Sequence, residues 1–169
     1  MAKVDIIRIP KQGSFLFYNL DAAVGKGGKN RRDDVLLAQY LLQVAASKGL
    51  VVDWKVVSPS VRTGNSTMQP PDTSDPGFTG SWNEWDVARL KGVEVFSTKK
   101  GVPAVQDGRI DPVPAGRTEG PIHHMQYKIV TLNLMYATHR PNDFPRMALA
   151  NDCPKELRQL IVAPDWLGG

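Results

Sequence analysis

The sequence has a single cysteine, Cys153, in 169 residues. One cysteine excludes an internal disulfide and is typical of a reducing compartment. No run of about 18 apolar residues is present, as a membrane-spanning helix would require. The first twenty residues also lack the apolar stretch and cleavage site of a secretory signal, because Asp5, Arg8 and Lys11 interrupt them. We therefore expect cytoplasmic synthesis, no membrane insertion, and any export by a non-Sec route or by release on lysis.

Motifs for catalysis and metal binding are also missing. Neither the nucleophile motif G-x-S-x-G nor the phosphate-binding motif G-x-x-x-x-G-K-[ST] occurs. His123 and His124 are adjacent and would point about 100° apart on a helix, whereas zinc proteases place two histidines four residues apart on one side. We expect no metal, no cofactor and no enzymatic activity. Cys153 leaves one alternative open, a hydrolase whose thiol pKa is lowered at the start of a helix.

The charge balance is mildly basic, with a formal net charge of +4. Such an excess favours anionic polymers in general, but it is too small to indicate a specific nucleic-acid partner. Part of it lies in the glycine-rich segment 21–32, DAAVGKGGKNRR, which we predict to be a flexible, solvated loop. The apolar share of 41% and the length predict one domain over residues 1–169 with one substantial core.

The N-terminal part predicts a hairpin followed by a buried helix. Segments 3–9 and 14–20 have the composition of two short strands, so we expect an N-terminal hairpin within residues 1–20. The helix from Asp34 to Lys48, DVLLAQYLLQVAASK, is apolar nearly all round, with Gln39 and Gln43 as its interior polar stripe. Asp33 or Asp34 is the expected cap.

Two further helices are predicted in the C-terminal part. The first begins at Pro121, and its apolar residues recur at helical spacing as Ile122, Met125, Ile129, Leu132 and Tyr136. We expect it to pack against the first helix. The last helix begins near Pro154, with Asn151 or Asp152 as its cap and an apolar stripe of Leu157, Leu160 and Ile161.

Residues 50–106 are predicted to form an insertion. It contains a strand at 50–57, a long exposed loop at 58–81, a helix from Ser81 to Gly92 with a Ser81–Glu84 capping box, and a hairpin made of 93–97 and 101–105. Trp82 and Trp85 on this helix either pack the insertion onto the core or line a binding groove.

Two groups of residues, one on the first predicted helix and one between Asp107 and Gln126, resemble the peptidoglycan-binding domain, a small three-helix module. Its usual pattern is V-x-x-L-Q-x-x-L on one helix, then D-G-x-F/V-G and T-x-x-A-V-x-x-F-Q. The matching residues are Val35, Ala38, Gln39, Leu42, Asp107, Gly108, Ile110, Thr118, Ile122, Met125 and Gln126. The resemblance implies an α+β fold with a three-helix bundle core made of 33–49 and 107–162, decorated by β-hairpins and the long loop insertion 50–106.

The same resemblance implies a non-catalytic module that holds a peptidoglycan strand or stem peptide beside the second helix. The ligand-binding residues that it implies are Asp107, Arg109, Thr118, His123 and Gln126. We add Trp82 and Trp85 to them as aromatic residues that could stack on sugar rings. Two alternatives stay open. One is a protein-interaction component of a phage particle or of a type VI-like contractile secretion apparatus, with a protein partner in place of the cell wall. The other is a cryptic cell-wall hydrolase centred on Cys153.

Overall fold

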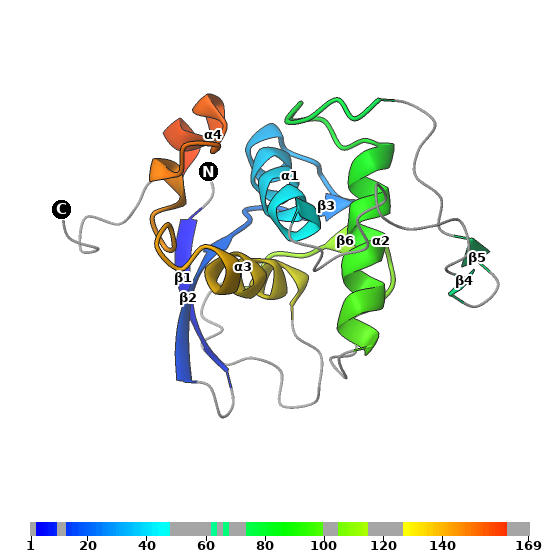
Figure 1. Ribbon diagram of the computed structural model, residues 1–169, viewed down its shortest axis with the longest axis horizontal. Helices are drawn as coiled ribbons and strands as arrows, with labels where there is room; N and C mark the ends of the chain where they lie inside the picture. The colour runs from blue at the N-terminus through cyan, green and yellow to red at the C-terminus, as the bar shows by residue number, and fades with distance from the viewer. Residues whose placement is uncertain are drawn as a thin grey trace.

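The computed structural model describes residues 3–9, 13–47, 62–63, 66–67, 74–99, 105–114 and 127–161. Within these ranges the chain forms four α-helices, one short 3₁₀ helix and three two-stranded antiparallel sheets. Helix α1 (Arg32–Ser47) contacts α2 (Glu84–Lys99), α3 (Lys128–His139) and α4 (Lys155–Leu160), and lies at the centre of the molecule in Figure 1. The mixed α+β class predicted from the sequence is confirmed.

The predicted N-terminal hairpin is present. Strands β1 (Lys3–Ile9) and β2 (Gly13–Asn19) pair antiparallel, with Lys3 opposite Asn19. Alternation along the strands buries Ile7 and leaves Ile6 52% exposed, as expected for a sheet with one covered face. Strand β2 contacts α3, so the covered face of the hairpin joins the core.

Two buried asparagines join β2 to its neighbours. On α3, Asn133 Oδ1 accepts the Tyr18 N–H at 2.8 Å and Asn133 Nδ2 donates to Tyr18 O at 3.0 Å. On β2, Asn19 Oδ1 accepts the Val113 N–H at 2.9 Å and Asn19 Nδ2 donates to Val113 O at 2.9 Å. Both amides supply the donor and acceptor that a neighbouring strand would offer to the backbone.

Helix α1 has the buried surface that its composition predicts, and it begins at Arg32. Asp34 therefore lies in the first turn and is not the cap of the helix. Its carboxylate is fully buried and accepts the N–H groups of Asp21 at 2.9 Å and Ala22 at 3.0 Å. Asp34 thus holds the loop that leads into α1 and does not cap the helix as predicted.

The glycine-rich segment differs from the predicted solvated loop, because hydrogen bonds and close packing hold it. Strand β3 (Val24–Gly25) pairs antiparallel with β6 (Arg109–Ile110). Gly25 has φ +103°, and a Cβ there would lie 2.4 Å from the Gly108 oxygen, so glycine is required. Asn30 Oδ1 accepts the Gly25 N–H at 2.7 Å. The segment brings the Asp107–Gly108 turn beside the start of α1.

The predicted boundaries of α2 are wrong at both ends. The helix continues to Lys99, through the residues predicted as the first strand of a hairpin. Val93 joins the core and Glu94 pairs with Lys128, so tertiary packing overrides the strand preference of β-branched residues. At the start, the reciprocal capping box is Asn83 with Asp86: Asn83 Oδ1 accepts the Trp85 N–H at 2.9 Å, and Asp86 Oδ2 accepts the Asn83 N–H at 3.0 Å.

The starts of α3 and α4 also differ from the prediction. Helix α3 begins at Lys128, since Tyr127 has an extended backbone with ψ 132°, and residues 121–126 lie outside the described ranges. Helix α4 begins at Lys155 after Pro154, and Asp152 is used in an ion pair with Arg140. The predicted apolar residues Ile129, Leu132, Tyr136, Leu157 and Ile161 are buried.

Of the predicted insertion, the strand at 50–57 lies outside the described ranges. The following segment contributes a small pair of strands, β4 (Arg62–Thr63) and β5 (Ser66–Thr67). Among the helices of the described ranges, none is long and apolar enough to cross a membrane.

Candidate functional site

The turn that carries Asp107 is tied to α2 and α3 by a buried cation. Lys128 Nζ contacts the Asp107 carboxylate, lies 2.8 Å from Glu94 Oε1 and donates to Arg109 O at 2.7 Å. The side chains of Lys128 and Glu94 are 8% and 1% exposed. Burial acts to raise the pKa of Asp107, but the Lys128 ammonium and the Arg109 N–H hold it below its usual value. Asp107 is therefore an ionised structural anchor whose side chain is 41% exposed.

Arg109 lies on the accessible side of the same turn. Its Nε donates to Asp111 Oδ1 at 2.7 Å, and the two side chains are 40% and 46% exposed. An ion pair with this exposure contributes little to stability. Arg109 and Asp107 thus form a small polar surface on a turn held in place by the buried Lys128.

The two tryptophans lie apart from this turn. Trp82 packs against the core and its Nε1 is buried without a hydrogen-bond partner, while the Arg89 guanidinium lies 5.5 Å from the Trp85 ring centroid. Both rings are half-buried. Along α2, Trp85 precedes Glu94 by nine residues, or roughly 13 Å at 1.5 Å per residue. The structure therefore does not bring the tryptophans to the Asp107 turn. Thr118, His123 and Gln126 lie outside the described ranges.

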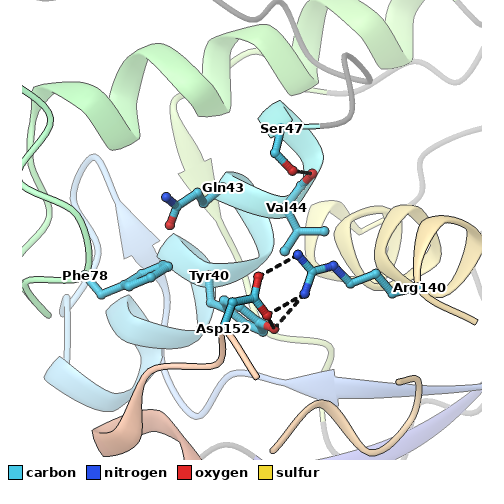
Figure 2. A pocket seen from close by; sticks show the side chains of 7 residues that line it. All are labelled: Tyr40, Gln43, Val44, Ser47, Phe78, Arg140 and Asp152. Carbon is cyan, nitrogen blue, oxygen red and sulfur yellow. Dashed lines mark hydrogen bonds and ion pairs between the residues drawn. The ribbon is translucent and has the colours of Figure 1, made fainter. Parts of the chain in front are cut away.

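A pocket of about 170 Å³ opens over the C-terminal half of α1. Figure 2 shows Phe78 on one side of it, Arg140 on the opposite side and Asp152 between them. The lining comes from α1, the segment before α2, the end of α3 and the segment before α4. Its residues are Tyr40, Gln43, Val44, Ser47, Phe78, Arg140 and Asp152.

One wall of the pocket is a charged hydrogen-bond network. Arg140 donates to both oxygens of Asp152, at 2.5 Å and 2.6 Å, in a two-pronged arrangement. The Tyr40 hydroxyl donates to Asp152 Oδ1 at 3.0 Å and accepts from Arg140 Nη1 at 3.3 Å. The Tyr136 hydroxyl lies 3.2 Å from the Tyr40 hydroxyl. The wall is thus preformed by groups from three parts of the chain.

The network is neutral overall near pH 7. The hydrogen bonds from Arg140 lower the pKa of Asp152, and the same contact raises the pKa of Arg140, so both stay charged. Burial, followed by the contact with Tyr136, raises the pKa of Tyr40, so this hydroxyl keeps its proton. The pocket therefore presents a fixed ion pair and a protonated phenol.

The opposite wall of the pocket combines apolar side chains with the Gln43 amide and the Ser47 hydroxyl. Gln43 Oε1 is buried and has no hydrogen-bond partner. Close to it, Ser47 Oγ donates to Val44 O at 2.9 Å. The sequence indicated Gln43 only as part of a polar stripe on a buried helix, and gave no sign that Arg140 and Asp152 would meet it.

The thiol of Cys153 is not activated. The residue is 3% exposed, and burial raises its pKa to about 11, so the thiol is protonated at neutral pH. The expectation that the start of a helix would lower this pKa is wrong, because desolvation outweighs the favourable contact with Arg158. In the described part of the chain, no three His, Cys, Asp or Glu side chains form a group that could hold a metal ion.

Comparisons with protein-family models, with curated proteins and with solved structures gave no match for this chain.

Proposed function

We propose that this chain is a non-catalytic binding module for peptidoglycan, and that the pocket over α1 holds part of the ligand. The observation behind the proposal is the composition of the pocket. Two aromatic side chains, Tyr40 and Phe78, stand beside a preformed polar network. Ligand sites for sugars and peptides commonly combine apolar walls with a few fixed polar groups. The pocket lining includes no thiol or histidine, and its one serine already donates to a backbone oxygen.

The choice of peptidoglycan comes from the sequence resemblance, and the arrangement of the matching residues supports it. Val35, Ala38 and Leu42 are buried on α1, which packs against α3. Ile110, directly after the Asp107–Gly108 turn, is also buried. We also propose that α1, α3 and α4 correspond to the three helices of the peptidoglycan-binding domain.

The surface predicted from the sequence is a second contact in this proposal. Asp107 and Arg109 are accessible on a turn that the buried Lys128 fixes. Such a turn gives a ligand a rigid pair of opposite charges at low entropic cost. Thr118, His123 and Gln126 stay predictions from the resemblance, and Trp82 and Trp85 stay predictions from their aromatic character.

Co-sedimentation with purified, insoluble peptidoglycan sacculi tests the proposal. The full chain is mixed with sacculi at low and at high salt, and the pelleted fraction is measured. A shaped pocket predicts binding that persists at high salt, because screening removes only the general attraction of a basic protein. A chain that stays in the supernatant, or is released completely by salt, would contradict the proposal.

A protein partner is the second candidate, and α2 is the observation that favours it. The predicted insertion contributes a helix of 16 residues that packs on α1 and leaves Val87 51% exposed. A helix with an exposed apolar residue offers a contact surface to a partner protein. Failure to bind sacculi, with recovery of one defined protein at fixed stoichiometry, would support this candidate.

A further inference from the structure

We infer that the pocket over α1 recognises a primary ammonium group on a short aliphatic stem, as in a lysine side chain, a diamino acid or a diamine. The inference rests on the proposed function, because it names the chemical group that the same pocket would hold. Its basis is the balance of donors and acceptors in the pocket lining.

The first observation is the free acceptor on Gln43. Its Oε1 is buried and unpartnered, and in Figure 2 this oxygen is turned toward Phe78 while the amide nitrogen points away. Buried acceptors in native proteins are nearly always hydrogen-bonded, so an orphan in a pocket marks the place of a missing donor. A ligand N–H at this position would complete the hydrogen bonding of Gln43.

The second observation is that both hydroxyl donors in the pocket lining are already used. The Tyr40 hydroxyl donates to Asp152, and the Ser47 hydroxyl donates to Val44 O. Arg140 directs hydrogen bonds to both oxygens of Asp152 and to the Tyr40 hydroxyl. Ser47 Oγ can then only accept from a further partner, and Asp152 Oδ2 keeps a free lone pair. Gln43 Oε1, Ser47 Oγ and Asp152 Oδ2 are thus available acceptors. They suit a ligand that donates several hydrogen bonds, as an ammonium does with its three N–H groups.

The third observation concerns charge and shape. The positive charge of Arg140 is compensated by Asp152, whose side chain is 52% exposed and reachable by a cation. Phe78 and Tyr40 add aromatic rings, which attract cations, and Val44 adds an apolar surface for methylene groups. A cavity of about 150 Å³ holds a benzene molecule. The pocket, at about 170 Å³, is therefore large enough for a butylammonium-sized group.

The test is a titration of the isotope-labelled full chain, followed by NMR, with Nα-acetyl-lysine methylamide. The matched probe is Nα-acetyl-norleucine methylamide, which has a similar stem without the ammonium. We expect saturable shifts with the lysine probe and none with the norleucine probe. Equal binding of both probes, or no saturable shift with the lysine probe at tens of millimolar, would overturn the inference and leave a pocket that holds only water.

Variants of Gln43 locate the interaction. Gln43→Glu adds a negative charge in nearly the same shape, and we expect it to tighten binding of the lysine probe by roughly three- to tenfold. Gln43→Met removes the acceptor and should weaken binding by a similar factor. Gln159→Glu adds the same charge at an exposed position outside the pocket lining and should leave the affinity unchanged. Equal tightening by Gln43→Glu and Gln159→Glu would show a general charge effect and contradict a site at Gln43.

The same samples separate this inference from the proposed function. Sacculi that pellet the chain while the lysine probe fails to bind would overturn the ammonium assignment and leave peptidoglycan binding standing. Binding of the lysine probe without binding to sacculi would support the ammonium site and remove peptidoglycan as its source, leaving a protein lysine or a small free diamine.

Discussion

Gln39 and Gln43 lie one turn apart on α1, and their side chains are in opposite situations. Gln39 Nε2 donates to Asp86 Oδ2 at 2.8 Å and to Ser81 O at 3.1 Å, and Gln39 Oε1 accepts the Gly80 N–H at 3.0 Å. Gln43 Oε1 is buried without a partner at the edge of a pocket. The closed region around Gln39 holds two segments together, whereas the open region around Gln43 leaves an acceptor for a ligand.

The closed region also explains how a carboxylate is accommodated in the core. Asp86 is fully buried, and burial raises its pKa, while hydrogen bonds from Gln39 and Asn83 favour its ionised form. Removing one of these partners would leave a charge without support. In the open region the charged pair is half-exposed and already satisfied, so changes there should affect binding more than folding.

The largest effect is expected at the other closed cluster of the molecule, around Lys128. Lys128→Met leaves the buried carboxylate of Glu94 without its cation and should lower the free energy of unfolding by about 3–5 kcal/mol. Urea denaturation measures the change. Lys91→Met, at a half-exposed position of α2, is the control and should cost less than about 0.5 kcal/mol. Equal losses in the two variants would show that the buried cluster does not stabilise the fold.

The next effect is expected at Gln39. Gln39→Leu removes the donor to Asp86 and the acceptor for the Gly80 N–H, and should lower the free energy of unfolding by about 2–3 kcal/mol. The same urea denaturation applies. A loss below about 0.5 kcal/mol would contradict a structural role for Gln39 and remove the contrast with Gln43.

A pH effect on the order of 1 kcal/mol is expected at Asp86. Its pKa is raised in the folded chain, so the folded state holds the proton more tightly than the unfolded state, in which the pKa is about 3.9. The wild type should therefore gain stability relative to Asp86→Asn as the pH falls from neutral toward about 4, with no further relative gain below that. Unfolding curves of both chains at several pH values measure the difference. If the wild type lost stability relative to Asp86→Asn on acidification, the raised pKa of Asp86 would be contradicted.

The smallest effect on stability is expected at Gln43. Gln43→Leu removes an acceptor that has no partner, so the free energy of unfolding should change by less than about 0.5 kcal/mol. Urea denaturation of Gln39→Leu and Gln43→Leu under the same conditions compares the two losses of unfolding free energy. A loss at Gln43 as large as that at Gln39 would mean that its amide supports the fold.

The elements with a strong local pattern were predictable from the sequence. The composition of segments 3–9 and 14–20 predicted β1 and β2, and the nearly continuous apolar run predicted α1. The extension of α2 was not predictable, because Val93 and Glu94 are helical only in contact with the core and with Lys128. Local strand preference favoured the wrong structure there.

The candidate pocket could not be predicted from the sequence, for a related reason. Gln43 was visible as a polar residue on a buried helix, but its missing partner appears only in three dimensions. Arg140 and Asp152 stand in the connections after α3 and before α4, and a turn brings them together. Asp152 was predicted as a helix cap because its position before Pro154 fits that role equally well.

Co-sedimentation with sacculi at high salt, with Gln39 and Gln43 variants in parallel, shows whether the open region of α1 binds the ligand. Under conditions where circular dichroism shows every chain folded, we expect the wild type and Gln39→Leu to pellet to the same extent and Gln43→Met to pellet in a smaller fraction, in line with a roughly three- to tenfold weaker site. A Gln43→Met chain that pellets as fully as the wild type would contradict the claim that the open region of α1 is the ligand site.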